Sequence, residues 1–183
     1  AFNSVPAGAA HYEKTGESLP AASLEAAGQS DAILLSATGL PSVRYPDGTE
    51  ITPQIDLRIA FNLFAGVRPV RAVAGPLTPL KIPDGKEIDF VLIRESTEGL
   101  FHTQGKGTVT NDMAEETLRI TRAVCEDLFR FTFSLADDRK TQGRGPGRVT
   151  CVDKANVFRA FAFFRDLFDA EAQKHPDLIA DHA

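Results

Sequence analysis

The 183-residue sequence contains no tryptophan, one methionine, two tyrosines and two cysteines. Cys125 and Cys151 lie in apolar surroundings and lack the Cys-x-x-Cys spacing of redox and zinc sites. We therefore expect buried free thiols in a reducing compartment; the alternative is a disulfide or a metal-binding pair. No apolar run approaches the roughly 20 residues of a membrane helix, and no basic segment precedes an apolar one as in a signal peptide. These absences predict a cytoplasmic protein that does not insert into membranes.

The sequence also lacks an excess of basic residues. Its formal net charge is -5 at pH 7, which argues against a general affinity for nucleic acids or anionic membranes. Hydrophobic residues make up 43% of the chain and charged residues 25%, close to the globular average. We therefore expect a folded protein with a hydrophobic core, a small-molecule ligand and no nucleic-acid partner.

Short apolar runs alternate along the chain with segments whose apolar residues recur at helical spacing. Two runs, residues 31–37 and 89–93, have the pattern of strands buried on both faces, and residues 148–152 are expected to form a third short strand. A further extended segment is expected at 69–73. Helices are expected at 23–29, ending at Gly28, at 55–64, ending before Gly66, at about 111–136, and at 157–174. This alternation indicates an α/β protein, in which ligands bind beyond the carboxyl ends of the strands.

The last two helices carry more detailed predictions. The first of them begins with Asn111 or Asp112 as its capping residue. Its inner face is expected to contain Leu118, Ile120, Val124, Leu128, Phe131 and Leu135. The other helix is expected to pack four phenylalanines into the core or a dimer interface: Phe158, Phe161, Phe164 and Phe168.

Four charged residues are candidates for a binding site: Arg58, Arg68, Arg94 and Lys154. Arg58 and Arg68 bracket a predicted helix and its exit, and the other two follow predicted strands. Guanidinium groups bind carboxylates through two hydrogen bonds, so a convergent set suits a substrate with two or more carboxylates. Spacing alone leaves open that all four are solvated surface side chains.

Four segments occur in order: Leu57-Arg58, Gly66-Val-Arg-Pro69, Arg94-Glu-Ser-Thr-Glu-Gly99 and Val152-Asp-Lys-Ala-Asn-Val157. This order resembles the decarboxylating hydroxyacid dehydrogenases that act on isocitrate, isopropylmalate and tartrate. The likeness covers nearly the whole chain, and the stretch Thr49 to Arg58 looks closest to the tartrate dehydrogenase branch. The resemblance implies an isopropylmalate dehydrogenase-like α/β fold of mixed sheets with flanking helices, incomplete at both ends. Residues 1–64 would belong to the larger, cofactor-side domain and residues 65–183 to the smaller substrate and dimerisation domain.

The same resemblance implies a role for each candidate. Arg58, Arg68 and Arg94 would bind the malate-like part of the substrate. Lys154 would accept or relay the proton of the substrate hydroxyl in the partner subunit's site of a homodimer, and Asn156 would contact the nicotinamide ribose. The implied cofactors are NAD and either Mn2+ or Mg2+. The family's glycine-rich opening turn is missing and its metal-binding aspartates are expected after Ala183, so no metal ligand is expected within the chain and the chain alone is expected to be inactive.

The residues just before Arg58 bear on the choice of substrate. Family members that bind an isopropyl group would have a pair of leucines there, whereas this chain has Gln54 and Ile55, with Thr52 upstream. A hydroxyl and an amide buried against an alkyl group would cost about 1–3 kcal/mol each. The sequence therefore predicts oxidation, with or without decarboxylation, of a tartrate- or D-malate-like acid rather than isopropylmalate.

Phe101 stands where the family normally has a tyrosine. A phenol can protonate the enolate left by decarboxylation, and a phenyl ring cannot. The adjacent His102 is a candidate replacement acid, although a histidine in a solvated loop is the simpler interpretation. This departure keeps two alternatives open: a non-catalytic or regulatory subunit of the same fold, and an inactive fragment that only dimerises. The loop at 103–110, where the family projects a dimerisation arm, is short and predicts a reduced arm.

Overall fold

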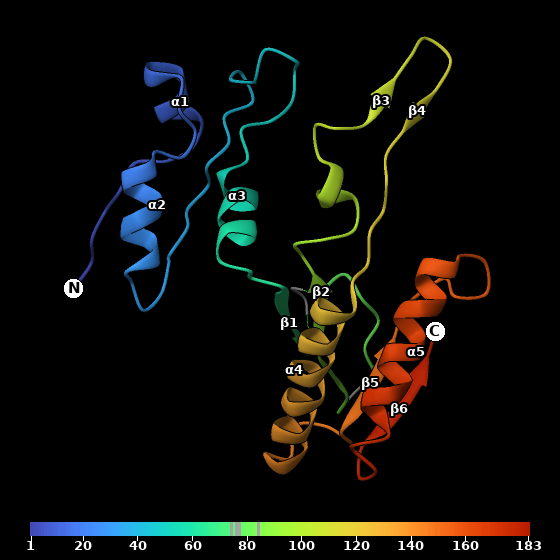
Figure 1. The fold of residues 1–183 in the computed structure, drawn as a ribbon. Coiled ribbons are helices and arrows are strands. Elements are labelled where there is room, and N and C mark those ends of the chain that lie inside the picture. Colours follow the sequence, from blue (N-terminus) through green and yellow to red (C-terminus); the bar gives the residue numbers. More distant parts are fainter. Residues whose placement is uncertain (74, 76–77, 84) are drawn as a thin grey trace. The chain divides into compact units, whose positions relative to one another are not determined.

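The computed structural model describes residues 1–73, 75, 78–83 and 85–183. They form two compact units, an N-terminal unit, Ala1–Leu63, and a C-terminal unit, Phe64–Ala183. Each unit has its own hydrophobic core, and helices and strands both occur, which confirms the predicted α/β class (Figure 1). Among the described residues, no helix combines the length and the apolar composition needed to cross a membrane.

The N-terminal unit contains three short helices joined by irregular segments: α1 (Ala9–Thr15), α2 (Ala21–Gly28) and α3 (Pro53–Ala60). Its core is small and consists of Ala9, Val43 and Ile51, with Tyr12 and Tyr45 packed against them. The backbone at Gly8 has a φ of 89°, and a Cβ there would lie 2.6 Å from the Thr38 carbonyl oxygen. That oxygen accepts a hydrogen bond of 2.7 Å from the Ala9 N–H, so a glycine is needed where α1 begins.

Two predictions for the N-terminal unit require correction. Residues 31–37 do not form the expected buried strand, and the side chain of Leu34 is 87% exposed. A strand buried on both faces needs hydrogen-bonded neighbours, and no described residue pairs with this segment. The helix expected at 55–64 ends at Ala60, because Asn62 adopts a left-handed conformation with a φ of 49°. The helix predicted at 23–29 is confirmed as α2.

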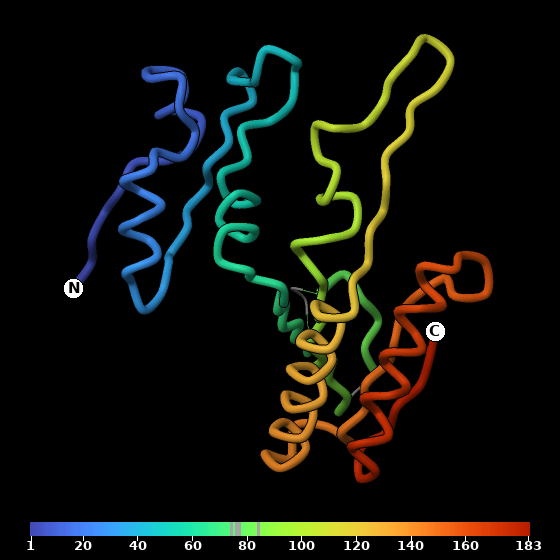
Figure 2. Tube along the Cα trace, viewed as in Figure 1, coloured from blue at the N-terminus to red at the C-terminus, as the bar shows by residue number. Residues whose placement is uncertain are grey.

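In the described part of the C-terminal unit, the strands form three separate pairs. Strand β1 (Ala65–Val73) runs antiparallel to β2 (Glu87–Glu95), and β5 (Arg148–Cys151) runs parallel to β6 (Ile179–His182). A third, short antiparallel pair joins β3 (Thr108–Val109) and β4 (Ala114–Glu115). This pair lies near the tip of a long loop of the same unit that runs between β2 and α4 (Figure 2).

Two long helices, α4 (Arg122–Thr141) and α5 (Arg159–Ala172), supply most of the core of the C-terminal unit. The buried residues of this core are Cys125, Leu128, Phe129, Phe133, Val149, Cys151, Leu167 and Phe168. The rings of Phe129 and Phe133 lie 5.5 and 5.3 Å from that of Phe168, so aromatic contacts join the helices. Both cysteines are free thiols, as predicted, and burial raises the pKa of each to about 12.

The strands predicted at 89–93 and 148–152 and the helix at 157–174 are confirmed in β2, β5 and α5. The expectation that both faces of β2 are buried is wrong, because Phe90 and Leu92 are 49% and 46% exposed. Helix α4 begins at Arg122 and not at Asn111 or Asp112, which lie in the turn between β3 and β4. Leu118 therefore lies before the helix and is 37% exposed, and Phe131 is 36% exposed because the buried face of α4 is centred on Phe129 and Phe133. Phe158 is likewise 55% exposed.

Candidate functional site

Arg68 and Arg94 lie on the same face of the β1–β2 pair. In the antiparallel register Gly66 is opposite Arg94, and Arg68 is opposite Leu92. Side chains alternate between the faces of a strand, so Arg68 shares a face with Gly66 and is a diagonal neighbour of Arg94. Such diagonal neighbours lie about 7–8 Å apart, within reach of one small molecule. A Cβ at Gly66 would lie 2.8 Å from the Ser96 hydroxyl oxygen, so the glycine allows the turn after β2 to fold closely over β1.

Most arginines of the chain form ion pairs with carboxylates, but the three predicted substrate-binding arginines do not. Within the described part of the chain, no aspartate or glutamate pairs with Arg58, Arg68 or Arg94. Arg68 and Arg94 are exposed, so both guanidinium groups are open to an anion from solvent. The structure brings these two together. Arg58 lies on α3 of the other unit, and its convergence with them stays a prediction.

The two glutamates of the segment after Arg94 organise the turn that follows β2. The Glu95 carboxylate accepts hydrogen bonds from the Thr97 N–H and hydroxyl, at 2.5 and 2.6 Å, and from the Glu98 N–H. Glu98 is buried, and its carboxylate accepts 2.8 Å hydrogen bonds from the N–H and the hydroxyl of Thr121. Thr121 is the residue before α4, so Glu98 ties the turn to the start of that helix. The sequence interpretation did not assign these roles, although two glutamates flanking a Ser-Thr pair were visible.

Phe101 contacts one of the two arginines. It lies in the short 3-10 helix η1 (Leu100–Thr103), and the Arg94 guanidinium carbon is 5.7 Å from the centre of its ring. This distance is within the range of a cation–π contact. The phenyl ring therefore lies beside the candidate anion site, but it carries no proton to donate there. His102 is adjacent in η1 and half-buried, with no hydrogen bond to a described residue.

Lys154 and Asn156 lie in the loop between β5 and α5. Both side chains are exposed, and neither forms a hydrogen bond or ion pair with the residues that the structure describes. Between them in sequence, the Ala155 N–H donates a 2.7 Å hydrogen bond to the buried carboxylate of Asp153. The same carboxylate accepts two hydrogen bonds from Arg165 of α5, at 2.9 and 2.7 Å. The Arg165 guanidinium holds the pKa of Asp153 below its usual value.

Thr52 and Gln54 lie where α3 begins. Gln54 is partly buried, and its side-chain oxygen accepts a 3.0 Å hydrogen bond from the Thr38 hydroxyl. The amide nitrogen of Gln54 then remains as the donor for a further partner. Thr52 directly precedes the helix, and its side chain makes no capping hydrogen bond. Both residues are in the N-terminal unit, together with Arg58.

The described residues do not provide a metal site. No group of three or more histidines, cysteines, aspartates or glutamates converges among them, so they do not fit the Mn2+ or Mg2+ that the resemblance implies. For NAD the chain offers one predicted contact, the exposed amide of Asn156, which has the donors and acceptor that a ribose hydroxyl needs.

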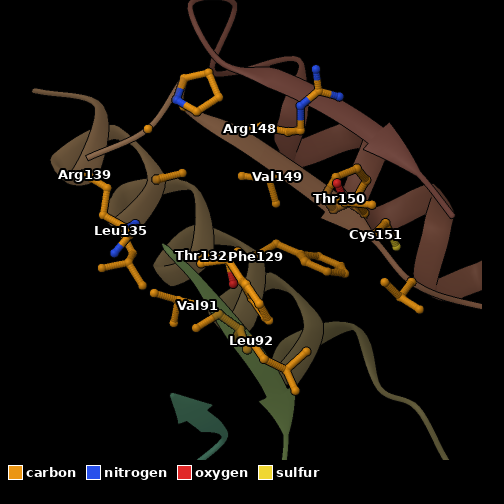
Figure 3. A pocket seen from close by; sticks show the side chains of 18 of the residues that line it. Val91, Leu92, Phe129, Thr132, Leu135, Arg139, Arg148, Val149, Thr150 and Cys151 are labelled. Atoms are coloured by element: carbon orange, nitrogen blue, oxygen red, sulfur yellow. The ribbon is translucent and has the colours of Figure 1, made fainter. Parts of the chain in front are cut away.

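A cavity of about 570 Å³ lies in the C-terminal unit between β2, α4 and β5. Figure 3 shows Val91 and Leu92 on one side, Val149 and Cys151 on the other, and Phe129 of α4 beside them. The lining is mainly apolar, and none of the predicted site residues contributes to it. The predicted site residues therefore lie outside this cavity, although it shares strand β2 with the candidate anion site.

Comparison with known proteins gives a consistent result. The model of the family described as isocitrate/isopropylmalate dehydrogenase matches residues 1–183. The 3-isopropylmalate/3-methylmalate dehydrogenase of Methanocaldococcus jannaschii is 35% identical over 93% of this chain and 47% of that protein. The 3-isopropylmalate dehydrogenase of Bacillus thuringiensis subsp. konkukian is 36% identical over 96% of this chain and 48% of that protein.

A crystal structure of isocitrate dehydrogenase from Methylococcus capsulatus aligns with a TM-score of 0.70 and 28% identity, covering 97% of this chain and 49% of that one. The chain thus spans about half the length of the curated relatives it matches.

Proposed function

Because the chain belongs to the isocitrate/isopropylmalate dehydrogenase family, we propose that it forms the substrate-binding part of an NAD-dependent dehydrogenase for a 2-hydroxydicarboxylate. The observation that carries the proposal is the placement of Arg68 and Arg94 on one face of the β1–β2 pair, without carboxylate partners. Each guanidinium can bind a carboxylate through two parallel hydrogen bonds, so the pair matches a molecule with two carboxylates. Arg58 is the third arginine of the proposed set.

The proposed reaction converts a secondary alcohol to a ketone. NAD, when bound, would supply the acceptor for the hydride that leaves C2 of the substrate. Lys154 accepts the hydroxyl proton, which requires the uncharged amine, and it does so in the partner subunit's site of a homodimer. Asn156 orients the cofactor through a ribose hydroxyl. The arginines contribute by holding both carboxylates in a fixed orientation.

The residues near α3 favour a polar substituent on the substrate. The side-chain oxygen of Gln54 already accepts a hydrogen bond from Thr38. Its amide N–H groups can therefore donate hydrogen bonds to a hydroxyl group of tartrate. An isopropyl group would leave those donors unpaired, at a cost of about 1–3 kcal/mol. The proposal is therefore a tartrate- or D-malate-like substrate, although the two relatives described above are named for isopropylmalate.

Phe101 supports a second candidate function, a non-catalytic or regulatory subunit that binds the dicarboxylate. Its ring contacts Arg94 at 5.7 Å, so it lies beside the candidate anion site but offers no acidic proton for decarboxylation. Binding by the two arginines does not depend on that proton. The two candidate functions, a dehydrogenase and a regulatory subunit, predict the same class of ligand, but only the dehydrogenase turns the ligand over.

An assay of NADH formation tests the proposal in the family-length protein, that is, this chain within a polypeptide as long as its curated relatives. D-Malate, tartrate and 3-isopropylmalate are compared in the presence of Mn2+, and the first two are expected to react faster. Arg94→Lys and Arg68→Lys should each lower kcat/KM by about 10- to 100-fold, because lysine cannot reproduce the two-point hydrogen bonding of arginine. Arg71→Lys is the matched control, since Arg71 lies on the opposite face of β1 and pairs with Glu87.

The outcomes separate the candidates. No turnover with any of the three substrates, together with measurable binding of the dicarboxylates, would favour the regulatory subunit. Equal activity of the Arg94→Lys and Arg71→Lys variants would refute the proposed anion site, because the face of β1 would then make no difference.

A further inference from the structure

Asp153 is the most completely buried carboxylate among the described ion pairs. Its side chain is 0% exposed, although Asp153 lies only two residues beyond the end of β5. The Arg165 Nε and Nη2 atoms donate to its two oxygens, at 2.9 and 2.7 Å. The Cys151 thiol lies 3.3 Å from one of these oxygens. A buried carboxylate is tolerated only when such donors replace its water shell, so the pair fixes Asp153 in one place.

The same carboxylate shapes the loop that follows. One oxygen accepts the Ala155 N–H at 2.7 Å, which bends the backbone around Lys154 in an Asx-turn. The Lys154 carbonyl then accepts the N–H groups of Val157 and Phe158, at 3.0 and 3.1 Å, which leads the chain into α5. The backbone of Lys154 and Asn156 is therefore held at both ends, while their side chains stay exposed and unengaged by the described residues.

We propose that the Asp153–Arg165 pair is a positioning element that fixes the backbone from which Lys154 and Asn156 extend. The inference rests on the proposed function, because a fixed backbone in this loop matters for turnover only if Lys154 and Asn156 have the roles proposed above. Neither Asp153 nor Arg165 touches the substrate. Their effect passes through the backbone, because consecutive Cα atoms are about 3.8 Å apart and a fixed Asp153 restricts where Lys154 can begin.

A second pair in the same unit provides a matched comparison. Arg139 of α4 donates a 2.7 Å hydrogen bond to Asp89 of β2, and the two side chains are 14% and 16% exposed. Like the Asp153–Arg165 pair, it links a helix to a strand region through an arginine and an aspartate. No predicted catalytic residue is adjacent to Asp89. If such pairs only hold the fold together, weakening either one should have similar consequences.

The test compares Arg165→Lys with Arg139→Lys in the family-length protein, well below the temperature at which either variant unfolds. Arg165→Lys is expected to lower kcat by about 10- to 100-fold, because small displacements of a catalytic group have effects of this size. The KM for the dicarboxylate should change by less than about threefold, since the arginines that bind it are intact. Arg139→Lys should leave both constants within about twofold of the wild type. Asp153→Asn, which keeps the shape of the side chain, serves as a second variant if Arg165→Lys does not fold.

Hydrogen–deuterium exchange provides a readout that does not depend on activity. The amides of Ala155, Val157 and Phe158 are hydrogen-bonded and should exchange at least about tenfold faster in Arg165→Lys than in the wild type. Unchanged exchange, or a kcat equal to that of Arg139→Lys, would overturn the inference. Lys154→Ala separates the two proposals. If that variant keeps full turnover, the proposed role of the lysine fails, and the exchange comparison still decides whether the pair orders the loop.

Discussion

The two units of the molecule differ in how well they bury their apolar residues. The core of the C-terminal unit joins residues from α4, α5 and β5, and it contains Phe133 and Phe168 at 0% and 1% exposure. The core of the N-terminal unit contains three buried residues, of which Ile51 is the largest. In the N-terminal unit, the apolar run at 31–37 remains largely in contact with solvent. Helices with a strand pair to pack against thus form a continuous core, whereas helices joined by irregular segments bury little.

Each unit has its own spectroscopic or chemical probe. Both tyrosines of the chain, Tyr12 and Tyr45, belong to the N-terminal unit, and there is no tryptophan. Both cysteines, Cys125 and Cys151, are buried in the C-terminal unit. Tyrosine fluorescence therefore follows the N-terminal unit and thiol labelling follows the C-terminal unit, so the stabilities of the two units can be compared within one sample.

The largest expected effect is the loss of an aromatic side chain from the larger core. Phe133→Ala should lower the free energy of unfolding of the C-terminal unit by about 3–5 kcal/mol, because it removes a fully buried ring and leaves a cavity. Labelling of the two thiols as a function of urea concentration measures this change. Phe131→Ala is the control on the same helix, since Phe131 is 36% exposed and should cost much less. Equal losses in the two variants would contradict the position of the core.

The elements that follow from local patterns were predictable from the sequence. The strands at 89–93 and 148–152 and the final helix are confirmed, because their periodicity is contained within each segment. The start of α4 was missed, since it depends on Glu98, whose carboxylate binds Thr121 at a separation of 23 residues. The run at 31–37 has the composition of a buried strand, but composition does not supply the neighbouring strands that such an element needs.

The candidate site was predictable to a similar extent. The ordered motifs identify the family, which the comparisons confirm, and they select Arg68 and Arg94, which the strand register then places side by side. The assignment to the tartrate branch, the role of Lys154 and the convergence of Arg58 stay predictions. The contacts of Asp153 were missed, because its partner Arg165 is 12 residues away and no periodic pattern connects them.

Lowering the pH is expected to have an intermediate effect on the stability of the two units. Hydrogen bonds from Arg139 lower the pKa of Asp89, those from Arg165 lower that of Asp153, and that from Thr150 lowers that of Asp181. A carboxyl with a lowered pKa stabilises the fold above its unfolded value of about 4, and this contribution is lost as the pH falls through the folded value. In the N-terminal unit, a hydrogen bond from Thr49 lowers the pKa of Asp47 but burial raises the pKa of Asp56, so the contributions of these two groups have opposite signs.

The C-terminal unit should therefore lose stability more steeply below about pH 4 than the N-terminal unit. Thiol reactivity is measured with a pyridyl disulfide reagent as the pH is lowered. The thiols are expected to become reactive at a higher pH than the pH at which the tyrosine fluorescence changes. Asp89→Asn should reduce the pH dependence of the thiol transition, because it removes one of the responsible groups. A tyrosine transition at the higher pH would reverse the comparison.

The smallest expected effect concerns a single hydrogen bond in the N-terminal unit. The Tyr45 hydroxyl donates a 2.9 Å hydrogen bond to the Ser18 hydroxyl oxygen, and its ring packs edge-on against Tyr12 at 5.1 Å. Tyr45→Phe keeps the ring contact and removes the hydrogen bond, so the unit should lose about 1 kcal/mol, measured by the fluorescence of the remaining tyrosine in urea. Tyr12→Phe is the matched control, because the Tyr12 hydroxyl has no hydrogen-bond partner among the described residues. Equal effects of the two substitutions would mean that ring packing alone stabilises this small core.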